Sequence, residues 1–196
     1  MPTEPFFAPS EYQSGSLTIR AYRPGDGAAL QAASVSSYEH LRPWMPWASR
    51  DQTVEQSEAH CRRFLGAYLQ NQDYALGIWL GDELAGGTGF HLRGRAHTSG
   101  YAEIGMWISA AQAGRGLGTQ ALRAMLVWGF SDAWGWERLE WRCDMRNLAS
   151  ARVAEKNGLA LEGTLRGDAR DVAGELRDTH IFGMLRRECQ GSANGA

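Results

Sequence analysis

The pattern of apolar and polar positions divides the chain into short strands and longer helices. The clearest alternation covers residues 101–109, where odd positions such as Glu103 fall on one face and even positions such as Met106 fall on the other. Because successive side chains of a strand point to opposite faces, this period of two predicts a strand with two unlike sides. Six further stretches have strand character: residues 17–22, 74–80, 84–92, 138–143, 160–166 and 176–184.

Four segments are predicted to be helical, and they run from Asp26 toward His40 and over residues 53–70, 117–134 and 147–157. Thr53 followed by Gln56 is typical of a capping box, and Gly158 is a glycine stop after the last helix. Early helices, then an antiparallel run, then strand–helix–strand–helix–strand predict an α/β or α+β sandwich around one central sheet.

Composition narrows the class of protein. A chain of 196 residues with 43% hydrophobic and 21% charged residues suits one globular domain. The net charge of −2, with basic residues scattered among acids, argues against a nucleic-acid surface. Three cysteines and five histidines without ligand spacing predict free thiols and no metal site. We see no signal peptide and no apolar run of about 18 residues, which predicts a cytoplasmic protein without membrane spans.

A glycine-rich turn connects the strand at residues 101–109 to the next helix. Backbone N–H groups at a helix start have no intrahelical partner, and the helix dipole adds positive charge there, so the turn predicts a phosphate or diphosphate site. The Gly-Lys-Ser/Thr motif of a P-loop is absent here, and the glycine spacing does not match a dinucleotide-binding fingerprint. The alternative is a tight turn without a ligand. The turn consists of Gly114, Arg115, Gly116, Leu117, Gly118 and Thr119.

The order of these motifs resembles the GNAT superfamily of N-acetyltransferases. The strand–GRGLGT–helix unit is followed by a strand, by an Asn-Leu-Ala-Ser helix start at Asn147 and by Glu-Lys-Asn-Gly-Leu at residues 155–159. The Trp-Met-Pro-Trp loop at residues 44–47, the Asn-x-x-Ser start and the LEGTLR segment resemble the RimJ/RimL-like subgroup. Two positions depart from the family pattern: Ala113 replaces its first Gln or Arg, and Leu159 replaces its usual Phe.

The resemblance implies a fold and a ligand. It implies a single domain with a mixed, mostly antiparallel sheet of about seven strands and about four helices, splayed where the strand ends near Ser109. Residues 16–188 would form this domain, with an N-terminal extension at 1–15 and a disordered tail at 189–196. Acetyl-CoA would bind through the backbone of the glycine turn, with Met106 and Ile108 contacting the pantetheine and Asn147 contacting the coenzyme.

The resemblance also implies direct attack of an amine on the thioester, which needs a base, an oxyanion donor and a group that stabilises the leaving thiolate. Glu103 is the candidate base, directly or through water, and its alternative role is a structural ion pair with an arginine. Ser150 is the candidate donor to the thiolate, although Asn147 and Ser150 also suit the capping of a helix start. Trp44 and Trp47 are candidate substrate contacts on a proline-rich loop.

The leading hypothesis is therefore an acetyl-CoA-dependent enzyme whose acceptor is a protein or peptide N-terminal α-amine. A small-molecule amine, such as an amino acid, a polyamine or an aminoglycoside, is the main alternative within the enzyme class. A CoA-binding regulatory module without catalysis is the alternative of another class. We expect a monomer or a homodimer with no nucleic-acid partner, and the sequence leaves the acceptor and the exact acyl group open.

Overall fold

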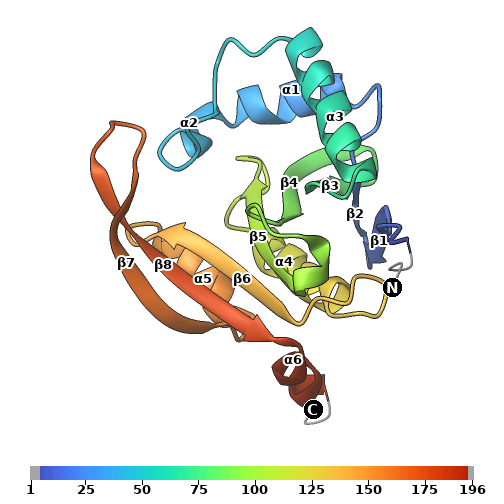
Figure 1. The fold of residues 1–196 in the computed structure, drawn as a ribbon. Coiled ribbons are helices and arrows are strands. Elements are labelled where there is room, and N and C mark those ends of the chain that lie inside the picture. Colours follow the sequence, from blue (N-terminus) through green and yellow to red (C-terminus); the bar gives the residue numbers. More distant parts are fainter. Residues whose placement is uncertain (1–4, 194–196) are drawn as a thin grey trace.

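The computed structural model describes residues 5–193, and these build one central sheet flanked by helices (Figure 1). The strands are β1 (Glu11–Ser14), β2 (Leu17–Ala21), β3 (Tyr74–Leu80), β4 (Glu83–His91), β5 (Tyr101–Ile108), β6 (Arg138–Asp144), β7 (Ala160–Arg170) and β8 (Leu176–Leu185). The helices are α1 (Gly27–Ser36), α2 (Tyr38–Leu41), α3 (Val54–Leu69), α4 (Leu117–Gly129), α5 (Leu148–Lys156), α6 (Arg186–Ala193) and a 3₁₀ turn at His97–Ser99.

The sheet has the strand order β1-β2-β3-β4-β5-β6-β8-β7, and it opens in the middle. All neighbouring strands are antiparallel except β5 and β6, which are parallel and pair only from Tyr101 opposite Arg138 to Glu103 opposite Glu140. Beyond that point β5 stays paired with β4, while β6 stays paired with β8. The predicted splay is therefore present, and it lies between β5 and β6. Figure 1 shows the long β7–β8 hairpin on one side of it and helices α1–α3 on the other.

The main core lies between the sheet and α4. Leu122, Met125 and Trp128 on α4 are buried with Ile104 and Phe90 on the sheet. A smaller apolar cluster of Tyr22, Leu30, Ala33, Cys61, Trp79 and Leu84 lies under α1 and α3 on the opposite side. Helices therefore cover both faces of the sheet. This arrangement leaves the opening between β5 and β6 as the break in an otherwise continuous layer.

The mixed α/β fold is confirmed, with differences at the ends of elements. Strand β1 was not predicted. It lies inside the predicted extension at residues 1–15 and pairs with β2. The first predicted helix ends at Ser36 and not at His40, because Ser37 turns the chain and its hydroxyl accepts the N–H of Ala110. The helix predicted over residues 117–134 is α4, and it ends at Gly129 and not at Trp134. Just after this end, the hydroxyl of Ser131 donates to the carbonyl of Trp128. The capping box of α3 at Thr53 is present.

The C-terminal end also differs from the expectation. The predicted tail of residues 189–196 begins inside α6, and residues 194–196 lie outside the described part of the chain. Within residues 5–193 no helix is both long and apolar enough to cross a membrane. The same residues contain no cluster of His, Cys, Asp or Glu side chains able to hold a metal ion.

Candidate active site

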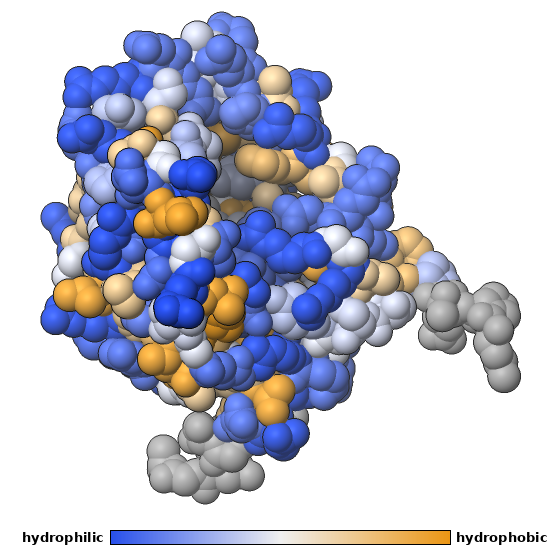
Figure 2. All heavy atoms as spheres, turned by 60° about the vertical axis from the view of Figure 1, so that its left-hand side comes forward, coloured by the Kyte–Doolittle hydropathy of each residue, from blue (hydrophilic) through white to orange (hydrophobic). Residues whose placement is uncertain are grey.

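A cavity of about 1340 Å³ lies at the opening between β5 and β6. Its walls come from β4, β5, β6, the start of α5, the loop of Trp44 and Trp47, and the glycine turn before α4. Figure 2 shows the surface hollowed on the side that faces left in Figure 1, with apolar and polar residues around the hollow. The cavity thus brings together sequence-predicted residues that lie up to about a hundred positions apart along the chain.

The glycine turn presents backbone donors to this cavity. Gly114 and Gly116 have φ of +73° and +85°, a region that glycine enters without the strain of a side chain. Gly116 is the N-cap of α4, and no described side chain caps that helix. Among residues 5–193, the N–H groups of residues 114–119 donate no hydrogen bond. Space beyond the Cα of Gly114 and Gly116 is open, so an anion can approach the amides closely.

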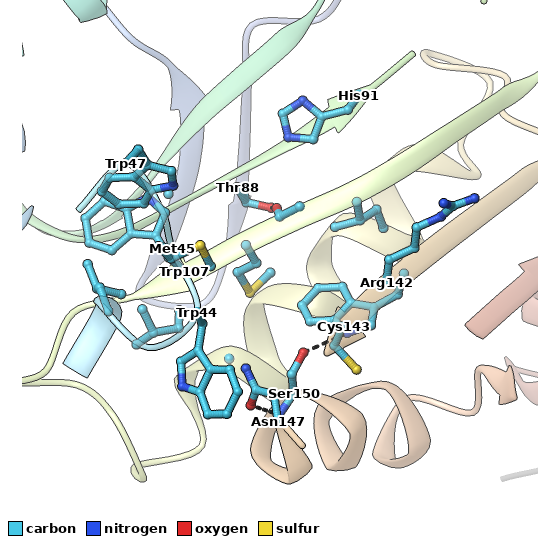
Figure 3. Close-up of a pocket in the computed structure, with 18 of the residues that line it drawn as sticks. Trp44, Met45, Trp47, Thr88, His91, Trp107, Arg142, Cys143, Asn147 and Ser150 are labelled. Carbon is cyan, nitrogen blue, oxygen red and sulfur yellow. Dashed lines mark hydrogen bonds between the residues drawn. The ribbon is translucent and has the colours of Figure 1, made fainter. Parts of the chain in front are cut away.

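The start of α5 holds the two other predicted residues of this side. The side chain of Asn147 accepts the N–H of Ser150 at 3.1 Å, so Asn147 caps the helix while lining the cavity. The indole N–H of Trp141 donates to Oγ of Ser150 at 3.0 Å, the bond drawn as a dashed line from the Ser150 oxygen in Figure 3. Because the hydroxyl oxygen accepts this bond, its own proton is left to donate, and the Cys143 thiol beside it is one acceptor. The local sequence does not predict the contact between Trp141 and Ser150.

Cys143 lies beside Ser150 at the end of β6 and is buried. Burial raises the pKa of its thiol, and the Ser150 hydrogen bond opposes that rise. A thiol with a raised pKa stays protonated and is a poor nucleophile at neutral pH. This agrees with a packing role for Cys143, which belongs to the main core.

Glu103 lies in the cavity wall, but its carboxylate is already paired. Nε of Arg93 donates to Oε2 at 2.8 Å and a second guanidinium nitrogen bonds Oε1. Nε of Arg142 lies 3.7 Å from Oε2. The side chain is only 7% exposed. The structural ion pair that the sequence left as the alternative is therefore present, and the assignment of Glu103 as base stays a prediction.

The aromatic loop forms one wall of the cavity. The rings of Trp47 and Trp107 meet edge-to-face with centroids 5.7 Å apart, and Trp44 and Trp47 are 37% and 48% exposed. The ring of Trp107 lies over Gly87, where a Cβ would come within 2.3 Å of the indole nitrogen. Glycine in β4 thus lets an indole lie flat on the sheet. Exposed aromatic rings at a cavity mouth are typical of a surface that binds a ligand.

The opposite wall contains a pair that the sequence analysis missed. His91 and Asp73 both line the cavity and hydrogen-bond to each other. They are 18 positions apart and meet because β3 and β4 pair antiparallel. No local pattern signals this contact. His97, which follows the same strand, stacks on Phe6 instead.

The β7–β8 hairpin is tied to the cavity by an ion cluster at the end of β6. Arg146 bonds both oxygens of Asp144, at 3.0 and 2.7 Å, and reaches Asp171 of the hairpin loop at 3.0 Å. Hydrogen bonds from Arg146 lower the pKa of both aspartates, against the desolvation that raises it. Both carboxylates line the cavity, so this cluster holds the hairpin wall in place.

We expect Arg146→Met to lower the melting temperature by a few degrees at neutral pH and to have little effect under strongly acidic conditions. The folded-state pKa values of Asp144 and Asp171 are depressed, so their stabilising contribution exists above the unfolded pKa of about 3.9. It is lost as the pH falls through the folded values. Thermal melts at both pH values measure this. Arg23→Met, which breaks an exposed pair with Glu11, is the control and should change little. An equal loss at both pH values would contradict the ionic explanation.

Comparison with known proteins gives consistent results. Residues 16–160 match the family described as an acetyltransferase (GNAT) domain. The chain is 25% identical over 176 residues to YdaF of Bacillus subtilis (strain 168), named as a candidate ribosomal N-acetyltransferase, covering 89% of this chain and 94% of that protein.

Two solved structures are similar in fold. The RimL ribosomal L7/L12 alpha-N-protein acetyltransferase in complex with coenzyme A has a TM-score of 0.78 at 22% identity, over 88% of this chain and 95% of that one. The microcin C7 self immunity acetyltransferase MccE, in complex with acetyl-CoA and AMP, has a TM-score of 0.80 at 21% identity, over 91% and 98% of the two chains.

Proposed function

Because the chain belongs to the GNAT family of acetyltransferases, we propose that it transfers acetyl from acetyl-CoA to the N-terminal α-amine of a protein or peptide. The acetyltransferase class itself follows from the family match over residues 16–160. The α-amine acceptor is supported by the names of YdaF and RimL and by the RimJ/RimL-like motifs of the sequence.

The observation that carries the proposal is the row of amides at the glycine turn that find no hydrogen-bond acceptor among the described residues. These donors open onto the same cavity as Ser150 and Asn147. We assign the diphosphate of the coenzyme to the backbone of Gly114, Arg115, Gly116, Leu117, Gly118 and Thr119. The pantetheine then extends along the opening, where Met106 and Ile108 of β5 line the cavity and offer backbone contacts.

Ser150 is suited to the leaving thiolate. Its oxygen is held by Trp141 and its backbone by Asn147, so the hydroxyl has a fixed position at the start of α5. A hydroxyl that accepts from an indole is oriented to donate, and a donor near the sulfur stabilises the charge that develops there. Trp44 and Trp47 lie at the cavity mouth, where we assign them to the acceptor.

A panel of acceptors tests the proposed function. Free-thiol release from acetyl-CoA should be seen with short peptides that have a free α-amine and a lysine. The same peptides with a blocked α-amine are the matched control and should be poor acceptors. Activity confined to amino acids, polyamines or aminoglycosides would replace the α-amine acceptor with a small molecule. Binding of acetyl-CoA without turnover of any amine would favour the regulatory module.

Glu103→Gln addresses the base predicted from the sequence. We expect kcat at neutral pH to fall while the affinity for acetyl-CoA barely changes, because Glu103 lies in the cavity wall on β5 and not at the glycine turn. Steady-state kinetics and calorimetry measure the two quantities. Wild-type kcat in this variant would remove Glu103 from the mechanism.

A further inference from the structure

His91 and Asp73 form a hydrogen-bonded pair that the mechanism above does not use. Nδ1 of His91 lies 2.9 and 3.0 Å from the two carboxylate oxygens of Asp73. A carboxylate accepts and does not donate, so Nδ1 carries the proton and Nε2 is the basic nitrogen. Asp73 therefore selects the tautomer in which the outer nitrogen can accept a proton.

The basic nitrogen lies directly on the backbone of β5. A Cβ at Gly105 would come within 2.7 Å of Nε2 of His91, so only glycine leaves room for the imidazole at this place. Among residues 5–193, Nε2 has no hydrogen-bond partner, and the His91 side chain is 26% exposed. Among the described residues Nε2 is thus unpaired, at the wall of the cavity that His91 lines (Figure 3).

His91 and Ser150 lie on opposite faces of the open sheet. His91 lies over Gly105, and Gly105 shares a face of β5 with Glu103 by the strand period of two. On β6, Arg142 approaches Glu103 and therefore lies on this same face. Its neighbour Trp141 points to the opposite face, because successive strand residues alternate. Trp141 holds Ser150 on the other face. An amine on the His91 side would therefore attack a thioester whose sulfur lies on the Ser150 side.

Every element packed around the His91–Asp73 pair contributes a charged or titratable side chain near it. Asp73 precedes β3, Arg93 follows β4, Glu103 is on β5, Arg142 is on β6, and His60 and Arg63 of α3 line the same cavity. Arg93 interacts electrostatically with Asp73, but both carboxylate oxygens of Glu103 engage its guanidinium. Glu103 thereby holds Arg93 and leaves Asp73 to His91. Glu103 then acts as a positioning residue and not as the base predicted from the sequence.

We propose that His91, oriented by Asp73, is the base that takes a proton from the acceptor ammonium group, an inference that rests on the proposed function. Nε2 accepts the proton, and the freed lone pair of the amine forms the C–N bond with the thioester carbonyl carbon. The C–S bond breaks, and its electron pair leaves on sulfur. The nitrogen loses a second proton as the amide forms, and this proton ends on the thiolate that Ser150 stabilises.

The test compares kcat/KM against pH for His91→Asn, Asp73→Asn and Glu103→Gln with a peptide α-amine acceptor. An α-amine has a reference pKa of about 8, so roughly a tenth is already neutral at pH 7 and the base contributes about tenfold. We expect His91→Asn and Asp73→Asn to lose about tenfold at neutral pH, and His91→Asn to change the acidic limb of the profile. Glu103→Gln should keep that limb. His180→Asn, a histidine paired with Thr164 away from the cavity, is the control.

Other results separate the possible failures. Wild-type rate and an unchanged acidic limb in His91→Asn would overturn the proposal, and so would an Nε2–H tautomer in the wild-type NMR spectrum. Should His91→Asn fail to fold, an Asp73→Asn protein with wild-type kcat/KM would overturn it as well. Failure of the proposed function is distinct, because the wild-type protein itself would release no thiol with any amine.

Discussion

Gly116→Val should weaken acetyl-CoA binding about a hundredfold. Valine at φ +85° costs about 1–2 kcal/mol, so the turn changes its conformation and its amides no longer converge. Loss of two hydrogen bonds from backbone N–H to a charged diphosphate, at about 1.5 kcal/mol each, gives roughly that factor. Calorimetric titration with acetyl-CoA measures the loss.

The control for this variant is Gly15→Val. Gly15 also has a positive φ, +61°, with open space around it, but it lies in the turn between β1 and β2 and outside the cavity. It should be strained to a similar degree and still bind acetyl-CoA. S-acetyl-pantetheine, which lacks the diphosphate, should bind wild type and Gly116→Val about equally. A similar loss with both ligands would show that the turn does not recognise the diphosphate.

Ser150→Ala should lower kcat about a hundredfold while acetyl-CoA affinity stays within a few fold. In the proposed function the hydroxyl donates to the leaving sulfur, and a donor that acts mainly in the transition state changes kcat more than binding. Single-turnover acetyl transfer and calorimetry measure the two quantities separately.

Removal of the Ser150 hydroxyl also leaves the buried indole N–H of Trp141 unpaired, which costs about 1–3 kcal/mol of stability. Trp141→Phe is the control, because it removes that N–H and keeps the hydroxyl. It should lose far less activity than Ser150→Ala. Equal losses in the two variants would assign Ser150 a structural role at the start of α5.

Local patterns were enough to predict the parts of the site that one segment builds alone. The glycine turn and the Asn147 cap depend on neighbours within a few residues, and the structure has both. The splay was implied by the family resemblance, and it is present where β5 and β6 stop pairing after Glu103. These features follow from backbone chemistry that is encoded in adjacent positions.

Contacts between distant segments could not be predicted in the same way. The pairs His91–Asp73, Glu103–Arg93 and Trp141–Ser150 depend on strand register and on loop geometry. A shift of one residue in a strand would turn His91 to the other face, and nothing in the local sequence fixes that register. An ion pair of Glu103 with an arginine was the alternative role, but the partner was not identifiable among the 20 basic residues.

A crystal structure with acetyl-CoA bound tests the central claim most directly. We predict diphosphate oxygens within hydrogen-bond distance of the amides between Arg115 and Thr119, with the thioester in the opening between β5 and β6. A coenzyme whose diphosphate lies elsewhere, with those amides bonded only to water or to protein, would contradict the assignment of the site.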